Sequence, residues 1–102
     1  MPESSDPAKL EEKRKLEDFH RQERHDQVAY LLGDHKGRAF IWDLLADCYV
    51  LRQPFVPGGP EGERLTTLRL GRLDIGLRLM HEVNQHPELY ELMRQEAAVR
   101  AE

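Results

Sequence analysis

Apolar residues gather in one short stretch near the middle of the chain and are scarce elsewhere. The stretch runs from residue 37 to residue 49 and holds the only Trp and the only Cys. Asp34 precedes it as a suitable N-cap, and Pro54 follows as a stop signal. We therefore predict a central helix with Leu44 in its core. The apolar positions recur as one stripe of an α-helix, and they are Phe40, Ile41, Leu44, Leu45 and Cys48.

A second segment further along the chain repeats this pattern. Gly71-Arg72 aligns with Gly37-Arg38, and Ile75 aligns with Ile41. The hydrophobic spacing of both segments is helical. We expect them to form two helices that share one core.

The second of these helices is predicted over residues 63–85, with Thr66 or Thr67 able to cap it if it begins late. Glycine inside a helix costs about 1 kcal/mol. We therefore expect another backbone to pack closely against Gly71 and Gly76. The expected core stripe is Leu68, Ile75, Leu79, Met80 and Val83.

The first 25 residues are predicted to form a charged N-terminal arm. Asp6 and Pro7 are a good N-cap and first helical residue, and charges of both signs follow at helical spacings. Few apolar residues interrupt them, so this helix is either solvated or packed on something outside the chain. Residues 28–32 are apolar and end at Gly33, which should bring the end of the helix into the core.

The remaining segments complete an all-α prediction. Residues 53–62 hold three prolines and three glycines, which exclude a helix or a central strand. Phe55 in this Pro/Gly loop could pack on the helices or on a neighbouring molecule. Pro87 opens a last amphipathic helix. We predict an arm over 1–25 and a helical domain over 26–102, forming a small bundle of three to four helices.

Composition narrows the classes of protein. The chain has 102 residues and a formal net charge of -4, which does not suit a general nucleic-acid binder. A single Cys cannot form an internal disulfide. No apolar run approaches the length of a membrane span, and no signal-peptide core is found near the start. We expect a soluble protein that is not secreted and has no membrane partner, with DNA contact not its main role.

The residues that could carry chemistry do not form a recognisable site. The five histidines lack the spacing and the additional ligands of a zinc site. Cys48 falls on the apolar stripe and is expected to be buried. The glycines of the loop are not preceded by a strand or followed by a lysine, as a phosphate-binding loop would be. We expect no catalytic residues, no cofactor and no metal.

Arg38 and Arg72 are the notable polar residues, because each follows a glycine at the start of an apolar stripe. Arginine binds carboxylates bidentately and is common at interfaces. The two residues could form ion pairs that join the helices, or one of them could contact an acidic group of a partner protein. The candidate intramolecular acids are Asp43, Asp47, Asp74 and Glu82.

Taken together, these motifs resemble a small domain family of tailed bacteriophages that is named after a Bordetella phage gene product. The resemblance spans about residues 26–97. It rests on the two Gly-Arg helices, the aromatic loop between them, and a short last helix that carries Tyr90, Met93 and Glu96. Genes of this family tend to lie among portal, scaffold and capsid genes.

The resemblance implies a virion or assembly protein and not a host enzyme, and it does not place the protein within the particle. Our first hypothesis is a non-enzymatic structural protein of the virion, built into the head near the portal vertex or its internal core. Its partners would be portal, capsid or internal-core proteins and further copies of itself, and it would be in the host cytoplasm during assembly. The alternative is a scaffold-like or packaging accessory protein that leaves before maturation. A helix-turn-helix DNA binder does not fit, because the loop between the repeated helices is too long.

The third expected helix carries more leucines than its core stripe requires, and exposed apolar residues of this kind indicate association. We predict that this helix, with an arginine rim, contacts the arm of an adjacent copy or an acidic surface on a portal or capsid subunit. The contact would be head-to-tail. The predicted interface residues are Leu65, Arg69, Leu70, Arg72, Leu73 and Leu77 on the helix, Leu16 and Phe19 on the arm, and Phe55 in the loop.

Overall fold

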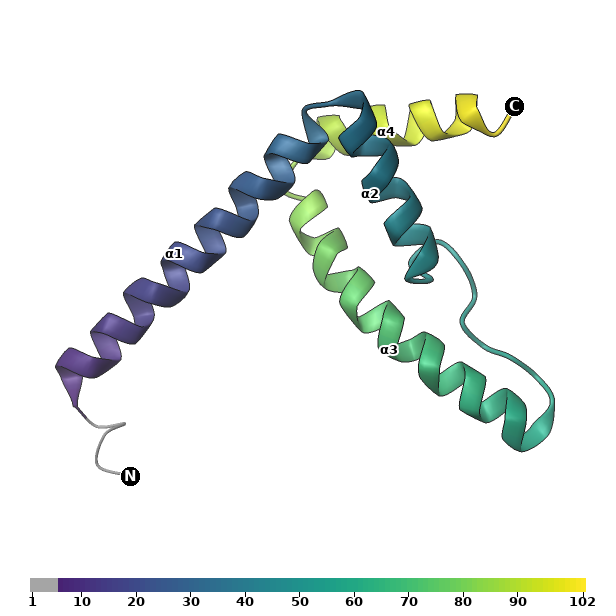
Figure 1. Cartoon of the computed structure of the whole chain (residues 1–102), viewed down its shortest axis with the longest axis horizontal. Helices are drawn as coiled ribbons and strands as arrows, with labels where there is room; N and C mark the ends of the chain where they lie inside the picture. The colour runs from purple at the N-terminus through teal and green to yellow at the C-terminus, as the bar shows by residue number, and fades with distance from the viewer. Residues whose placement is uncertain (1–5) are drawn as a thin grey trace.

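The computed structural model describes residues 6–102, and the regular structure in this range consists of four α-helices. They are α1 (Pro7–Leu32), α2 (His35–Asp47), α3 (Gly59–Val83) and α4 (Pro87–Arg100) (Figure 1). The predicted all-α class and small helical bundle are thereby confirmed. The first five residues of the predicted arm lie outside the described range.

The predicted caps position the helices as expected. The Asp6 carboxylate accepts a hydrogen bond from the backbone N–H of Ala8, and Pro7 is the first helical residue of α1. Asp34 caps α2 by accepting from the backbone N–H groups of Lys36 and Gly37. These carboxylates satisfy amide groups that have no partner within the helix.

Helix α3 begins at Gly59, four residues before the predicted start. Gly58 and Gly59 have φ values of 117° and 68°, which glycine adopts without steric cost. Thr66 does not cap the helix, contrary to one of the predicted options. Its hydroxyl instead accepts a hydrogen bond from the backbone N–H of Val56, at 2.8 Å. The Pro/Gly loop is thus attached to the second turn of the helix.

The core lies where the end of α1, the middle of α2, the end of α3 and the middle of α4 meet. The main buried side chains are Val28, Leu32, Ile41, Leu45, Val83 and Met93.

The predicted register is only partly right. Ile41 and Leu45 are in the core, but Phe40 and Leu44 are exposed on the side of α2 that the other helices leave uncovered. On α3, Leu68 and Ile75 were expected in the core stripe but are exposed, because they too lie on a side of their helix that the other helices leave uncovered.

The molecule has the outline of a V, with α1 and α3 diverging from a common corner (Figure 1). Its Cα radius of gyration is 18.3 Å, whereas about 13 Å is expected for a compact domain of this length. The principal extents are 55 × 42 × 17 Å. At the corner, the imidazole rings of His25 and His86 pack with their centroids 4.8 Å apart. The core therefore occupies one end of the molecule, and the free ends of α1 and α3 extend away from it.

Candidate interaction surface

The dipeptide Gly37-Arg38 joins the first two helices. A Cβ atom at position 37 would lie 2.0 Å from the carbonyl oxygen of Leu31, so only glycine allows α2 to approach the end of α1 this closely. The approach places the Arg38 guanidinium next to the end of α1, where it donates a 2.8 Å hydrogen bond to the carbonyl oxygen of Leu32. A helix C-terminus carries unpaired carbonyls and partial negative charge, so a cation is stabilising there.

Arg38 also connects α2 to α4. Its Nε donates a 2.7 Å hydrogen bond to the Glu96 carboxylate, which also interacts with His35. Burial raises the pKa of the Glu96 carboxyl group, but the hydrogen bonds from Arg38 and His35 lower it, and the net result is a pKa below the ordinary value. The ion pair is therefore a charged contact that joins three helices near the core.

The partners predicted for Arg38 were wrong, although an intramolecular ion pair was one of the predicted options. None of the four acids proposed from the sequence contacts it, because the contact comes from α4, 58 residues further along the chain. Arg38 is only 9% exposed, which rules it out as a direct contact to a partner protein. Glu96 lies on the same face of α4 as Met93 and Ala97, both buried, but no signal in the sequence pairs this face with Arg38.

Another backbone was predicted to pack closely against both Gly71 and Gly76 of α3, and the two positions differ in the structure. A Cβ atom on Gly76 would lie 2.5 Å from Cγ2 of Val50 and 2.6 Å from Cβ of Cys48, so the end of α2 packs tightly against this point. Gly71 has open space at the corresponding position, and the prediction of a close backbone there is wrong for the described residues. The sequence repeat is thus not a structural repeat, since Ile41 is buried and its counterpart Ile75 is 63% exposed.

The residues predicted for the interface between copies differ in their exposure in the single chain. Leu65 and Leu73 are half-buried, and the Arg69 guanidinium lies over the Tyr49 ring, 4.9 Å from its centroid. Arg72 is exposed beside the end of α2. The exposed apolar members are Leu70 and Leu77 on α3, Leu16 and Phe19 on α1, and Phe55 in the loop.

A concave surface lies where the first three helices converge. It is a cleft of about 380 Å³. Leu44 and Ile75 are exposed within it, and Leu68 lies two helical turns further out on the same side of α3. We call this cleft the V groove; its lining residues are Arg24, Leu44, Ile75, Arg78, Leu79 and Glu82.

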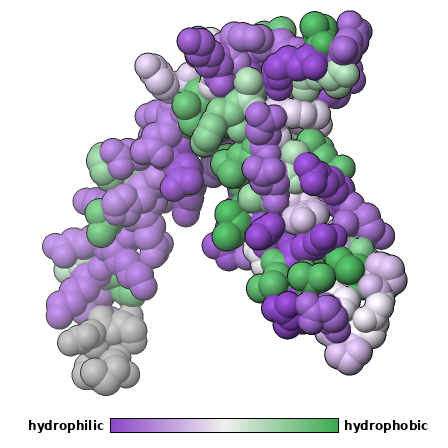
Figure 2. All heavy atoms as spheres, turned by 45° about the vertical axis from the view of Figure 1, so that its right-hand side comes forward, coloured by the Kyte–Doolittle hydropathy of each residue, from purple (hydrophilic) through white to green (hydrophobic). Residues whose placement is uncertain are grey.

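The arm presents a second exposed surface. The residues of α1 from Pro7 to Arg24 are all exposed, and Figure 2 shows the free end of α1 as largely hydrophilic with isolated hydrophobic side chains. Leu16 and Phe19 are each 57% exposed. Glu12 and Glu23 lie one turn before and one turn after them on the same face. We call these four residues the outer arm face.

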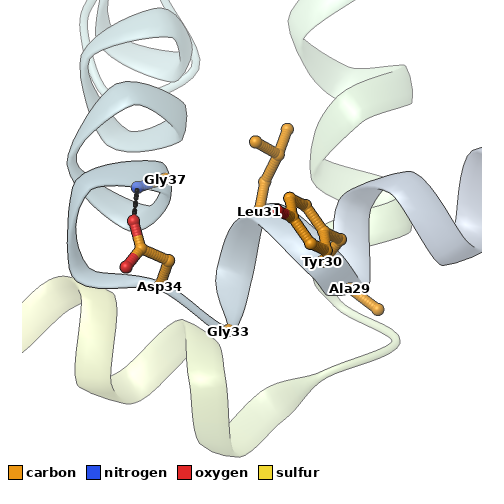
Figure 3. Close-up of a pocket in the computed structure, with 6 residues that line it drawn as sticks. All are labelled: Ala29, Tyr30, Leu31, Gly33, Asp34 and Gly37. Atoms are coloured by element: carbon orange, nitrogen blue, oxygen red, sulfur yellow. Dashed lines mark hydrogen bonds between the residues drawn. The ribbon is translucent and has the colours of Figure 1, made fainter.

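A separate pocket of about 510 Å³ lies at the turn between α1 and α2. Its lining includes Tyr30, which is 82% exposed, and Asp34 (Figure 3). The Asp34 carboxylate is already used to cap α2, with a hydrogen bond from Gly37 that Figure 3 shows. The other lining groups are small or apolar, so this pocket offers little chemistry for a polar ligand.

The described residues contain neither a cluster of metal-ligating side chains nor a helix suited to a membrane. Residues 6–102 contain no group of three or more His, Cys, Asp or Glu side chains placed to hold a metal ion. No helix in this range is both long enough and apolar enough to cross a membrane.

Comparisons with known proteins add no family to these observations. No protein-family model, no curated protein and no solved structure matches the chain.

Proposed function

We propose that this chain is a structural, non-enzymatic protein of a tailed bacteriophage virion, which acts through protein–protein contacts in the head at the portal vertex or internal core. The observation that carries the proposal is the open V, which leaves large apolar side chains exposed on both of its diverging helices. A small soluble chain that leaves such side chains exposed is suited to association. The resemblance of its two Gly-Arg helices to the phage family supports the virion as the place of association.

The proposal is tested by quantitative mass spectrometry of purified particles. A virion subunit is expected in mature particles at a fixed copy number relative to the portal protein. A transient assembly factor would be found in immature heads and be absent from mature ones. The second result would replace the proposed function with the scaffold-like or packaging alternative.

A further inference from the structure

We infer that the V groove is the binding site for the outer arm face of a second copy of this chain, in a head-to-tail contact. This inference rests on the proposed function as a contact-making subunit and adds the partner and the surface. The occupant is one amphipathic helix, which is a common ligand for an apolar groove.

The exposed area of the chain matches this arrangement. The chain exposes 7757 Å², whereas about 6,000 Å² is expected for a compact monomer of its mass. The excess reflects the elongated V, with its radius of gyration of 18.3 Å, which leaves surface on both diverging helices available for association. A head-to-tail contact uses two different patches on every copy.

The two surfaces are complementary in charge and hydrophobicity. The V groove has exposed Leu44 and Ile75 between Arg24 of α1 and Arg78 of α3, and its lining keeps an excess of positive charge because Glu82 is its single acid. The outer arm face has Leu16 and Phe19 between Glu12 and Glu23. The Arg24 guanidinium has no ion pair within residues 6–102, and Arg78 pairs only with exposed Asp74, at 3.1 Å. Both guanidinium groups can therefore receive an acid from an incoming helix.

A chain cannot place its own outer arm face in its own V groove. Arg24 lines the groove, and Phe19 is five residues earlier on the same helix. Five residues turn an α-helix by about 140° beyond one full turn, so Phe19 points away from the groove. The V also holds α1 and α3 apart (Figure 1). A second copy is the occupant that satisfies both surfaces.

The test uses the full chain with one apolar-to-acid substitution in each surface: Phe19→Asp in the outer arm face and Ile75→Asp in the V groove. Val99→Asp on α4 is the matched control, because Val99 is similarly exposed and belongs to neither surface. Circular dichroism confirms that each variant is folded, and light scattering after size exclusion gives its mass. We expect the wild type and the control to associate, with a mass that rises with concentration. Each surface variant alone should associate at least about tenfold more weakly and should be monomeric at a concentration at which the wild type associates.

The decisive sample is an equal mixture of the two surface variants. The Phe19→Asp copy keeps an intact groove, and the Ile75→Asp copy keeps an intact arm, so the mixture should form a heterodimer although each variant alone is monomeric. A mixture that stays monomeric would falsify the arm-in-groove contact, as would a wild-type chain that is monomeric well above micromolar concentration.

Failure of this inference can be distinguished from failure of the proposed function. If Phe19→Asp and Ile75→Asp chains enter purified particles at the normal copy number, the virion function stands and the contact between copies is wrong. If the mixture forms a heterodimer while the wild type is absent from mature particles, the contact stands and the virion function is wrong.

Discussion

Two glycines of the same helix, α3, have opposite surroundings. Gly76 packs against the side chains of Cys48 and Val50, which stand on either side of the left-handed residue Tyr49 just after the end of α2. Gly71 is five residues earlier and faces open space. Close packing therefore requires glycine at position 76, whereas no neighbouring group requires it at position 71.

We predict opposite effects when each of these glycines is replaced by alanine. Gly76→Ala should lower the free energy of unfolding by about 1–3 kcal/mol, because the added methyl group overpacks the contact with α2. Gly71→Ala should raise it by about 0.5–1 kcal/mol, because alanine is the better helix former at an exposed position. Urea denaturation of the isolated chain measures both. Destabilisation by Gly71→Ala would mean that a neighbouring backbone covers this position.

The Glu96 carboxylate should make stability sensitive to acid. Its folded-state pKa is lowered, so its stabilising effect is complete above the ordinary glutamate pKa of about 4.3 and is lost as the pH falls through the lower folded-state value. We predict that Glu96→Gln is less stable than the wild type at pH 7 and that the difference shrinks below about pH 4. Thermal melts over this pH range measure it.

Glu91→Gln is the control for this experiment. Glu91 also has a lowered pKa, caused by its hydrogen bond with Arg94, but this pair is exposed and lies within one helix. Exposed ion pairs contribute little to stability, so Glu91→Gln should melt close to the wild type at pH 7. If both variants were equally destabilised, the special role of the Arg38–Glu96 contact would be refuted.

At the scale of whole helices, the capping residues were predicted correctly, whereas the hydrophobic periodicity predicted the buried faces only in part. The caps at Asp6 and Asp34 depend on side chains that bond to the adjacent backbone, and the sequence located both. The face that α3 buries could not be predicted, because its leucines and isoleucine surround most of the helix. Only the position of α2 decides which of them are covered. The Arg38–Glu96 pair could not be assigned for the same reason, since it requires the position of α4.

The register of α2 can be tested with two neighbouring leucines. Leu45 is fully buried, whereas Leu44 is 37% exposed and lines the V groove. We predict that Leu45→Ala lowers the free energy of unfolding by about 2–5 kcal/mol, as for a buried leucine. Leu44→Ala in the isolated chain should cost about 1 kcal/mol, because a large part of its side chain is already in water. Denaturant melts giving the reverse order would show that α2 is rotated from the orientation described.

At the scale of the whole molecule, the fold and the contact surfaces depend on different parts of the chain. The core is made by residues from Val28 onward, and the free end of α1 makes no buried contact. Isolated helices as short as this end are marginal in water. The arm therefore adds area for association without adding to the core.

This separation predicts the behaviour of a chain that lacks residues 1–20. The shortened chain keeps Val28 and Leu32 in the core, Arg24 in the V groove and His25 against His86. Its free energy of unfolding should stay within about 1 kcal/mol of the full-length value, because only exposed residues of α1 are lost. It should not associate with itself, yet its intact groove should still bind the arm of a full-length Ile75→Asp chain. Urea denaturation and light scattering measure the two properties separately. A shortened chain that is unfolded would place the arm in the folded domain and refute the boundary near residue 25.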